Sequence, residues 1–294
     1  MPKLNEVLNS IIKFIPNLLT LINLSFGFIG IVLAFHSELA WAGVMVFVAS
    51  IFDYFDGFAA RLLNAQSEVG KELDSLADMV AFGLLPGLIA YQYLNGIQGI
   101  YFVSPLERDL VPHLISMTGF LLTACSALRL AKFNVDTRQS DNFIGLPTPA
   151  TAIFIASIPI LSEWQFRFNM YVAIDEEMLN NLIRINRYDG FEAGMIGLLQ
   201  NVNFWIVTIL VLSYLMVSPL PIISMKLKSL KWEQNKWRFI FIGTALVTIF
   251  ICFFDVMFST GWLPWFQFVF IPMIIVDLIL VSVVKRIVDG KPKY

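Results

Sequence analysis

The chain has 294 residues, of which 57% are hydrophobic and only 14% are charged, and its mean hydropathy is +0.73. This balance excludes an ordinary soluble domain and indicates an integral membrane protein. The net charge of −2 says little about partners, and we expect no nucleic acid among them. The two cysteines, Cys125 and Cys252, lie in apolar runs, so the sequence predicts no disulfide framework.

Eight apolar runs follow one another along the chain, each long enough or nearly long enough to cross a bilayer as a helix. The fifth run is short and contains three prolines, so it needs neighbouring helices to satisfy its backbone. We predict an all-α, polytopic membrane bundle of about eight transmembrane helices, in which a six-helix core precedes two C-terminal helices. The predicted spans are Asn17–Phe35, Ala40–Arg61, Leu73–Leu94, Leu110–Ala131, Leu146–Leu161, Val202–Ile222, Phe239–Phe258 and Leu263–Val284.

Lysine and arginine are unevenly divided between the two ends of this bundle. With a cytoplasmic N-terminus, sixteen of the twenty lie at cytoplasmic ends or in cytoplasmic loops. Only Arg108, Arg167, Arg184 and Arg187 lie on the opposite side. Because cytoplasmic loops are enriched in Lys and Arg, we predict that both termini are cytoplasmic. We expect the protein in the cell inner membrane or an equivalent membrane.

Four aspartates, at positions 53, 56, 74 and 78, lie in or beside the second and third apolar runs. An ionised carboxylate is costly to hold in hydrocarbon without a partner. Residues three and four apart share a helical face, so each helix presents two of these aspartates on one side. Two antiparallel helices joined by a short turn would bring the two pairs together. Hard oxygen ligands of this kind suit Mg²⁺ or Mn²⁺, and we predict two divalent ions, roughly 3.5–4 Å apart.

Glycines and an arginine accompany the aspartates. Gly57 and Gly70 remove side chains where a ligand must approach the backbone closely. Arg61 is placed to meet phosphate or to balance the acids. Asp53 lies eight residues before Arg61, and hence about 12 Å deeper in the membrane. The predicted site is a shallow cavity, open to the cytoplasm at the depth of lipid phosphates. An alternative interpretation as helix caps and surface charges suits one or two acids better than four.

The spacing D-x-x-D-G-x-x-A-R, eight residues, then G-x-x-x-D-x-x-x-D is filled at every fixed position between Asp53 and Asp78. It resembles the signature of the CDP-alcohol phosphotransferase family, whose members move a phosphoalcohol from a CDP-linked donor to an acceptor hydroxyl and release CMP. The segment from Ile15 to Asn23 resembles the Pro-Asn-x-x-Thr-x-x-Asn opening of many members. The resemblance implies a homodimer.

The resemblance also implies roles for individual residues. Two divalent ions would be held by Asp53, Asp56, Asp74 and Asp78, and Asp78 would be the catalytic base. The residues that would bind the CDP part of the donor are Asn17, Thr20, Asp53, Asp56, Gly57, Ala60, Arg61 and Gly70.

Two later segments narrow the resemblance to one branch of the family. The residues from Ser126 to Asn134 resemble A-L-R-L-A-[RK]-F-N, and those from Phe143 to Pro149 resemble F-x-G-L-P-x-P, as found in phosphatidylserine synthases. Residues implied to bind the acceptor or the lipid phosphate are Arg129, Lys132 and Asn134. Arg129 is the expected partner of an acceptor carboxylate, because its planar fork suits that group better than lysine.

The resemblance, which covers Phe14 to Ser162, implies transfer of a phosphatidyl group from CDP-diacylglycerol to the hydroxyl of L-serine, with membrane lipids as further partners. Residues 1–225 would form the transferase domain, with an outer loop at 162–200. Residues 226–294 would add a basic cytoplasmic loop and two helices without assigned chemistry. Another acceptor alcohol, such as glycerol 3-phosphate, inositol or inositol phosphate, stays open. A cation transporter is a further alternative, although it should carry acids deep across several helices.

Overall fold

The computed structural model describes residues 2–135, 143–165, 190–224, 232–259 and 268–290. These residues are almost entirely helical, and two two-residue strands form the only sheet among them. The helices and strands are α1 (Pro2–Phe35), α2 (Leu39–Leu62), α3 (Glu68–Asp78), the π-helical turn η1 (Met79–Leu84), α4 (Leu85–Ile97), α5 (Leu110–Met117), α6 (Gly119–Val135), β1 (Phe143–Ile144), α7 (Thr148–Ile160), the π-helical turn η2 (Leu161–Gln165), α9 (Gly190–Leu199), α10 (Val202–Val217), β2 (Pro221–Ile222), α11 (Trp232–Ser259) and α12 (Phe270–Asp289).

The prediction of an all-α membrane bundle is confirmed. Five helical segments of the described residues are long and apolar enough to cross a membrane, and a sixth results if α9 and α10, bent by 70°, count as one span. Each of the eight predicted runs overlaps a helix, so the order of elements agrees with the sequence. The count of eight spans stays a prediction. The five segments are Phe14–Phe35, Leu39–Leu62, Glu68–Ile97, Leu110–Val135 and Asn235–Cys252.

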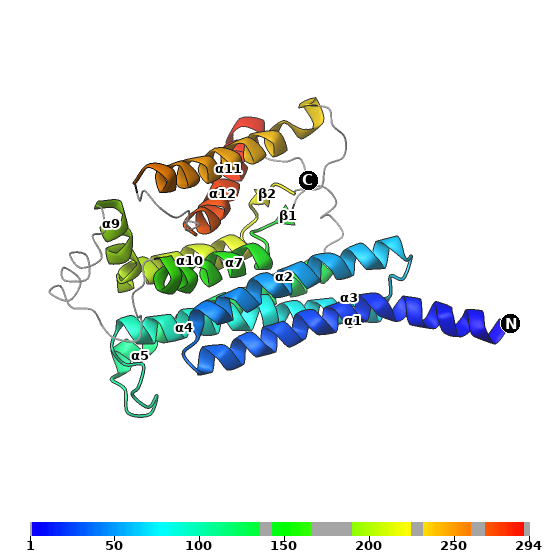
Figure 1. Ribbon diagram of the computed structural model, residues 1–294, viewed down its shortest axis with the longest axis horizontal. Helices are drawn as coiled ribbons and strands as arrows, with labels where there is room; N and C mark the ends of the chain where they lie inside the picture. The colour runs from blue at the N-terminus through cyan, green and yellow to red at the C-terminus, as the bar shows by residue number, and fades with distance from the viewer. Residues whose placement is uncertain (1, 136–142, 166–189, 225–231, 260–267, 291–294) are drawn as a thin grey trace.

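Helices α1, α2, α4, α7 and α10 run in roughly the same direction across the view, and α12 crosses them steeply (Figure 1). Helices α1 to α4 form the lower part of the view, α7 lies next to α2, α10 lies next to α6, and α11 with α12 lies furthest from α1. Helix α2 packs against both α1 and α7, and α6 packs against α10. The hairpin of α2 and α3 thus lies inside the bundle's first half, beside α1.

Glycines let several of these helices approach backbone to backbone, as is common in membrane bundles. A Cβ atom added at Gly43 of α2 would lie 2.4 Å from the carbonyl oxygen of Ala156 on α7. One added at Gly119 of α6 would lie 2.6 Å from the carbonyl oxygen of Gly87 on α4. These contacts fix how each helix is rotated, and therefore which side chains face the aspartates.

The π-helical turn η1 follows Asp78 directly and interrupts the regular α-helical hydrogen bonds of the third span. The hydroxyl of Thr123 on α6 donates a hydrogen bond of 3.0 Å to the carbonyl oxygen of Gly83 inside this turn. Because π-helical turns are rare and frequently lie at functional sites, the position of η1 beside Asp78 is informative. Gly83 lies within this turn, and Pro86, which lacks an N–H and would clash with the carbonyl of Phe82, follows it, so the sequence contains a local reason for an irregular helix there.

Helix α12 packs on the core directly against α7 and also against the small sheet. Strand β1 pairs antiparallel with β2, Phe143 opposite Ile222. The hydroxyl of Ser282 on α12 accepts a hydrogen bond of 3.2 Å from the backbone N–H of Ile223, just after β2. The predicted boundary at residue 225 stays a prediction, and residues 225–231 of the basic loop and 166–189 of the outer loop lie outside the described residues.

Candidate active site

The turn between α2 and α3 brings the two aspartate-bearing helices together. Helix α3 begins at Glu68, ahead of the predicted run that starts at Leu73. The side chain of Ser67 accepts a hydrogen bond of 3.0 Å from the backbone N–H of Gly70 and so caps the new helix. A serine just before a helix is a recognisable start signal, so this boundary was available from the sequence.

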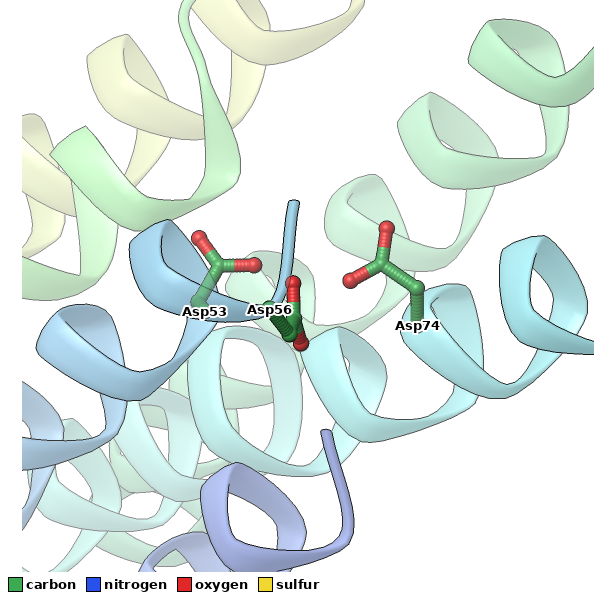
Figure 2. Close-up of side chains that lie close together, drawn as sticks. All are labelled: Asp53, Asp56 and Asp74. Atoms are coloured by element: carbon green, nitrogen blue, oxygen red, sulfur yellow. The ribbon is translucent and has the colours of Figure 1, made fainter. Parts of the chain in front are cut away.

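Three of the four predicted metal ligands converge between these helices. Asp53 and Asp56 project from α2 and Asp74 projects from α3 toward them (Figure 2). One carboxylate oxygen from each lies within 4.8 Å of the other two. The hydroxyl of Thr20 on α1 donates a hydrogen bond of 2.7 Å to Oδ2 of Asp56, which is only 5% exposed. We call these three aspartates together with Asp78 the aspartate group.

The aspartate group is electrostatically unfavourable unless a cation is present. Oxygens of Asp53, Asp56 and Asp74 lie within 4.8 Å of one another, and at that distance with an effective dielectric constant near 20 two ionised carboxylates repel by roughly 3.5 kcal/mol. One oxygen of Asp74 and one of Asp78 are buried without a hydrogen-bond partner. Hard, closely spaced oxygens of this kind fit Mg²⁺ or Mn²⁺, so the residues present suit a divalent cation.

Asp78 lies at the inner side of the aspartate group. It is outside the set within 4.8 Å, but its carboxyl contacts that of Asp53. Arg129 of α6 interacts electrostatically with Asp78 and is only 6% exposed. The guanidinium of Arg129 lies over the ring of Phe133, 5.9 Å from its centroid, while its Nε is buried without a hydrogen-bond partner. A buried cation with an unused donor therefore faces the aspartates from a third helix.

The other two residues of the predicted acceptor set are placed differently. The side-chain amide of Asn134 donates a hydrogen bond of 2.9 Å to the hydroxyl of Ser75 on α3. The ammonium of Lys71 donates one of 3.2 Å to the backbone carbonyl of Asn134. Asn134 therefore ties the end of α6 to the helix that carries Asp74. Lys132 is exposed on α6.

A cavity of about 590 Å³ opens beside the aspartate group, a volume typical of a small-molecule site. Seven of the eight residues predicted to bind the CDP part line it, and Asp53 is the exception. A Cβ atom added at Gly57 would meet nothing within 4 Å, so this glycine leaves space for a ligand. The sequence did not single out Lys71, which also lines the cavity. The lining residues are Pro16, Asn17, Thr20, Asp56, Gly57, Ala60, Arg61, Ala65, Gln66, Ser67, Glu68, Gly70, Lys71 and Asp74.

A family model described as CDP-alcohol phosphatidyltransferase matches residues 13–179, more than half of the chain. The chain belongs to the CDP-alcohol phosphatidyltransferase family. Every residue of the predicted site lies inside the matched part, which also contains α2, α3 and α6. The protein is therefore a membrane-embedded transferase.

Individual members of the CDP-alcohol phosphatidyltransferase family are similar to this chain over much of their length. A protein of Helicobacter pylori named CDP-diacylglycerol–serine O-phosphatidyltransferase is 31% identical over 221 residues, which are 71% of this chain and 84% of the relative. One of Bacillus subtilis with the same name is 33% identical over 47% of this chain and 70% of the relative. An archaetidylserine synthase of Methanothermobacter thermautotrophicus is 32% identical over 61% of this chain and 72% of the relative.

Proposed function

We propose that this transferase moves the phosphatidyl group of CDP-diacylglycerol to the hydroxyl of L-serine, giving phosphatidylserine and CMP. The observation that carries the choice of serine is the buried guanidinium of Arg129 beside Asp78. Serine brings a carboxylate as well as a hydroxyl, and a buried arginine suits the carboxylate. The printed names of the similar proteins from H. pylori and B. subtilis support the same acceptor.

The donor nucleotide fits the cavity beside the aspartate group. Arg61 and Lys71 line it and offer two cations for the pyrophosphate. Gly57 leaves space in the cavity for the donor. On the side of α1 the cavity is narrower, because Gly70 lies close to Asn17: a Cβ atom at Gly70 would lie 2.9 Å from Oδ1 of Asn17. The exposed apolar side chains of α2, such as Phe58, leave a path for the acyl chains toward lipid.

The aspartate group is the proposed binding site for two divalent cations, Mg²⁺ or Mn²⁺. Asp53, Asp56 and Asp74 would hold them, with Asp78 completing the second position. Bound there, the cations would supply positive charge that stabilises the negative charge developing on the leaving CMP. The chain's own contribution is to hold the carboxylates in position for the cations. The hydrogen bond from Thr20 does this for Asp56.

The proposed reaction is one displacement at phosphorus. The serine hydroxyl oxygen forms a bond to the phosphorus that carries diacylglycerol, and the bond from that phosphorus to the CMP oxygen breaks. CMP leaves with the electron pair. Asp78 accepts the hydroxyl proton as the new bond forms. Asp78 is partly buried, Arg129 is buried, and the two interact electrostatically, so together they would orient the hydroxyl and the carboxylate of one serine toward the donor.

Release of CMP with a panel of acceptors tests this proposal directly. Purified protein with CDP-diacylglycerol and Mn²⁺ should release CMP with L-serine at least about 100-fold faster than with glycerol 3-phosphate, inositol or inositol phosphate, because only serine pairs its carboxylate with Arg129. Preference for one of the other alcohols would overturn serine as the acceptor while leaving the transferase chemistry intact. Absence of CMP release with every alcohol would leave cation transport as the alternative to test.

We also propose that the cavity faces the cytoplasm and that both termini are cytoplasmic, from the distribution of Lys and Arg. In a background without Cys125 and Cys252, a cysteine replacing Gln66 should react with a membrane-impermeant maleimide only from the cytoplasmic side. A cysteine replacing Leu106, which is 96% exposed between α4 and α5, should react only from the other side. Labelling of both positions from one side would reject this orientation.

The family resemblance further leads us to propose a homodimer. Light scattering of the protein in detergent should give the mass of two chains after subtraction of the bound detergent, and the mass of one chain would reject the dimer.

A further inference from the structure

Asn23 on α1 is a buried polar residue that the proposed reaction does not use. Its side chain is 0% exposed, yet neither its amide nitrogen nor its amide oxygen has a hydrogen-bond partner. Native proteins rarely leave a buried amide wholly unsatisfied, because the group loses its bonds to water and gains nothing in return. We therefore expect the Asn23 amide to gain a hydrogen-bond partner when the neighbouring site binds its ligand.

Two contacts between α1 and α2 bracket Asn23. One turn before it, Thr20 donates to Asp56 with a hydrogen bond of 2.7 Å. Three residues after it, the ring of Phe26 stacks on that of Phe52, with centroids 5.4 Å apart. The amide of Asn23 therefore lies level with the turn of α2 between Phe52 and Asp56, and Asp53 belongs to that turn.

Two contacts of α1, one with α3 and one with η1, bracket the same amide from the other side. Near the start of α3, a Cβ atom at Gly70 would lie 2.9 Å from Oδ1 of Asn17 on α1. Further along, a Cβ atom at Gly27 would lie 3.0 Å from Cα of Ala81. Midway between these contacts lies the turn of α3 that runs from Asp74 to Asp78. Because helical side chains lean toward the N-terminus of their helix, the Asn23 amide leans back toward this turn.

The unpartnered amide of Asn23 therefore lies level with the aspartate group, which has unpartnered carboxylate oxygens that could accept a hydrogen bond from it. Oδ1 of Asp74 and Oδ1 of Asp78 are buried and unpartnered as well. Carboxylates that bind a metal through one oxygen are normally hydrogen-bonded by a neighbouring residue, which fixes their orientation. Asn23 itself does not line the cavity, whereas Asp56 and Asp74 do.

We propose that Asn23 is a positioning residue, whose amide donates a hydrogen bond to a carboxylate oxygen of the aspartate group when a divalent cation is bound. This inference rests on the metal site proposed above. The amide is neutral, so it orients a carboxylate without removing the negative charge that attracts the cation. Asn23 thereby performs for Asp74 and Asp78 the task that Thr20 performs for Asp56.

Binding of Mn²⁺ to the purified full-length protein, measured by electron paramagnetic resonance without substrates, tests this role. Asn23→Leu removes the amide at similar volume and should weaken Mn²⁺ binding about 10–100-fold. Asn23→Ser keeps a hydrogen-bonding group and should lose less affinity than Asn23→Leu. The melting temperature of Asn23→Leu without metal should equal or exceed that of the wild type, because an unsatisfied buried amide has been removed.

Ser213→Ala is the matched control. Ser213 of α10 is 5% exposed and its hydroxyl is also unpartnered, but α10 carries none of the aspartates. This variant should bind Mn²⁺ as the wild type does. Unchanged Mn²⁺ affinity in Asn23→Leu would overturn the positioning role alone. If the wild type itself binds no Mn²⁺, both the metal site and this inference are overturned, whereas a different acceptor alcohol would leave the inference standing.

Discussion

Replacing Asp56 with asparagine should reduce CMP release by at least about 1,000-fold. The change keeps the shape of the side chain and the hydrogen bond from Thr20, which is 2.7 Å long, but removes one negative charge from the aspartate group. A cation held by fewer anionic oxygens binds more weakly and neutralises less charge on the pyrophosphate in the transition state. Turnover of CDP-diacylglycerol with saturating serine measures the loss, and titration with Mn²⁺ separates weaker metal binding from slower chemistry.

Asp277 of α12 supplies a matched control for this experiment. Its carboxylate accepts a hydrogen bond of 2.7 Å from the hydroxyl of Thr248, so it repeats the pairing of Asp56 with Thr20 on helices outside the site. Asp277→Asn should keep CMP release within about threefold of the wild type. Excess chelator should stop the wild-type reaction, and added Mg²⁺ or Mn²⁺ should restore it. Full activity in chelator would remove the metal from the mechanism.

The conservative change Arg129→Lys should raise the KM for serine about 10–100-fold. A charge-assisted hydrogen bond is worth about 1.5–3 kcal/mol, and lysine keeps the charge while losing the planar, two-pronged geometry that suits a carboxylate. Arg129 is only 6% exposed, so water cannot easily take the place of the lost contact. Initial rates with either substrate varied give the KM for serine and for CDP-diacylglycerol, and the latter should change by less than about threefold.

Arg238→Lys controls for the general cost of shortening a buried arginine. Arg238 is 9% exposed, and its guanidinium donates hydrogen bonds to the carbonyl oxygen of Ser224 and to Oδ1 of Asn235, remote from the aspartates along the chain. The KM of the Arg238→Lys variant for serine should stay at the wild-type value. If Arg129→Lys instead raises the KM for CDP-diacylglycerol first, Arg129 binds the lipid phosphate and the assignment to serine is wrong.

Some features of the site follow from local sequence alone. A three-residue step puts Asp53 and Asp56 on one face of any helix, and a four-residue step does the same for Asp74 and Asp78. The apolar residues around them force a helical, membrane-embedded setting, because only a helix satisfies its own backbone there. These local rules need no knowledge of distant contacts.

The position of Asp78 relative to the other aspartates depends on more than its spacing. Asp78 shares a face with Asp74, yet only Asp74 joins Asp53 and Asp56 in the set of oxygens within 4.8 Å. The π-helical turn η1 begins at the next residue and accommodates Thr123 from α6 through the carbonyl of Gly83. Gly83 and Pro86 favour an irregular helix at this point, but the hydroxyl that bonds to the turn comes from a residue forty positions away, which no local pattern identifies.

The sequence by itself determined the membrane-embedded helices, the aspartate spacing and the family resemblance, since each depends on residues close together in the chain. The tertiary structure decided which oxygens converge, that Asn134 bonds to Ser75 and that Arg129 is buried beside Asp78. It also left Asn23 buried without a partner. The physical reason is helix rotation. Close contacts such as that between Gly87 and Gly119 set how each helix turns about its axis, and they join residues from different spans that no local pattern relates.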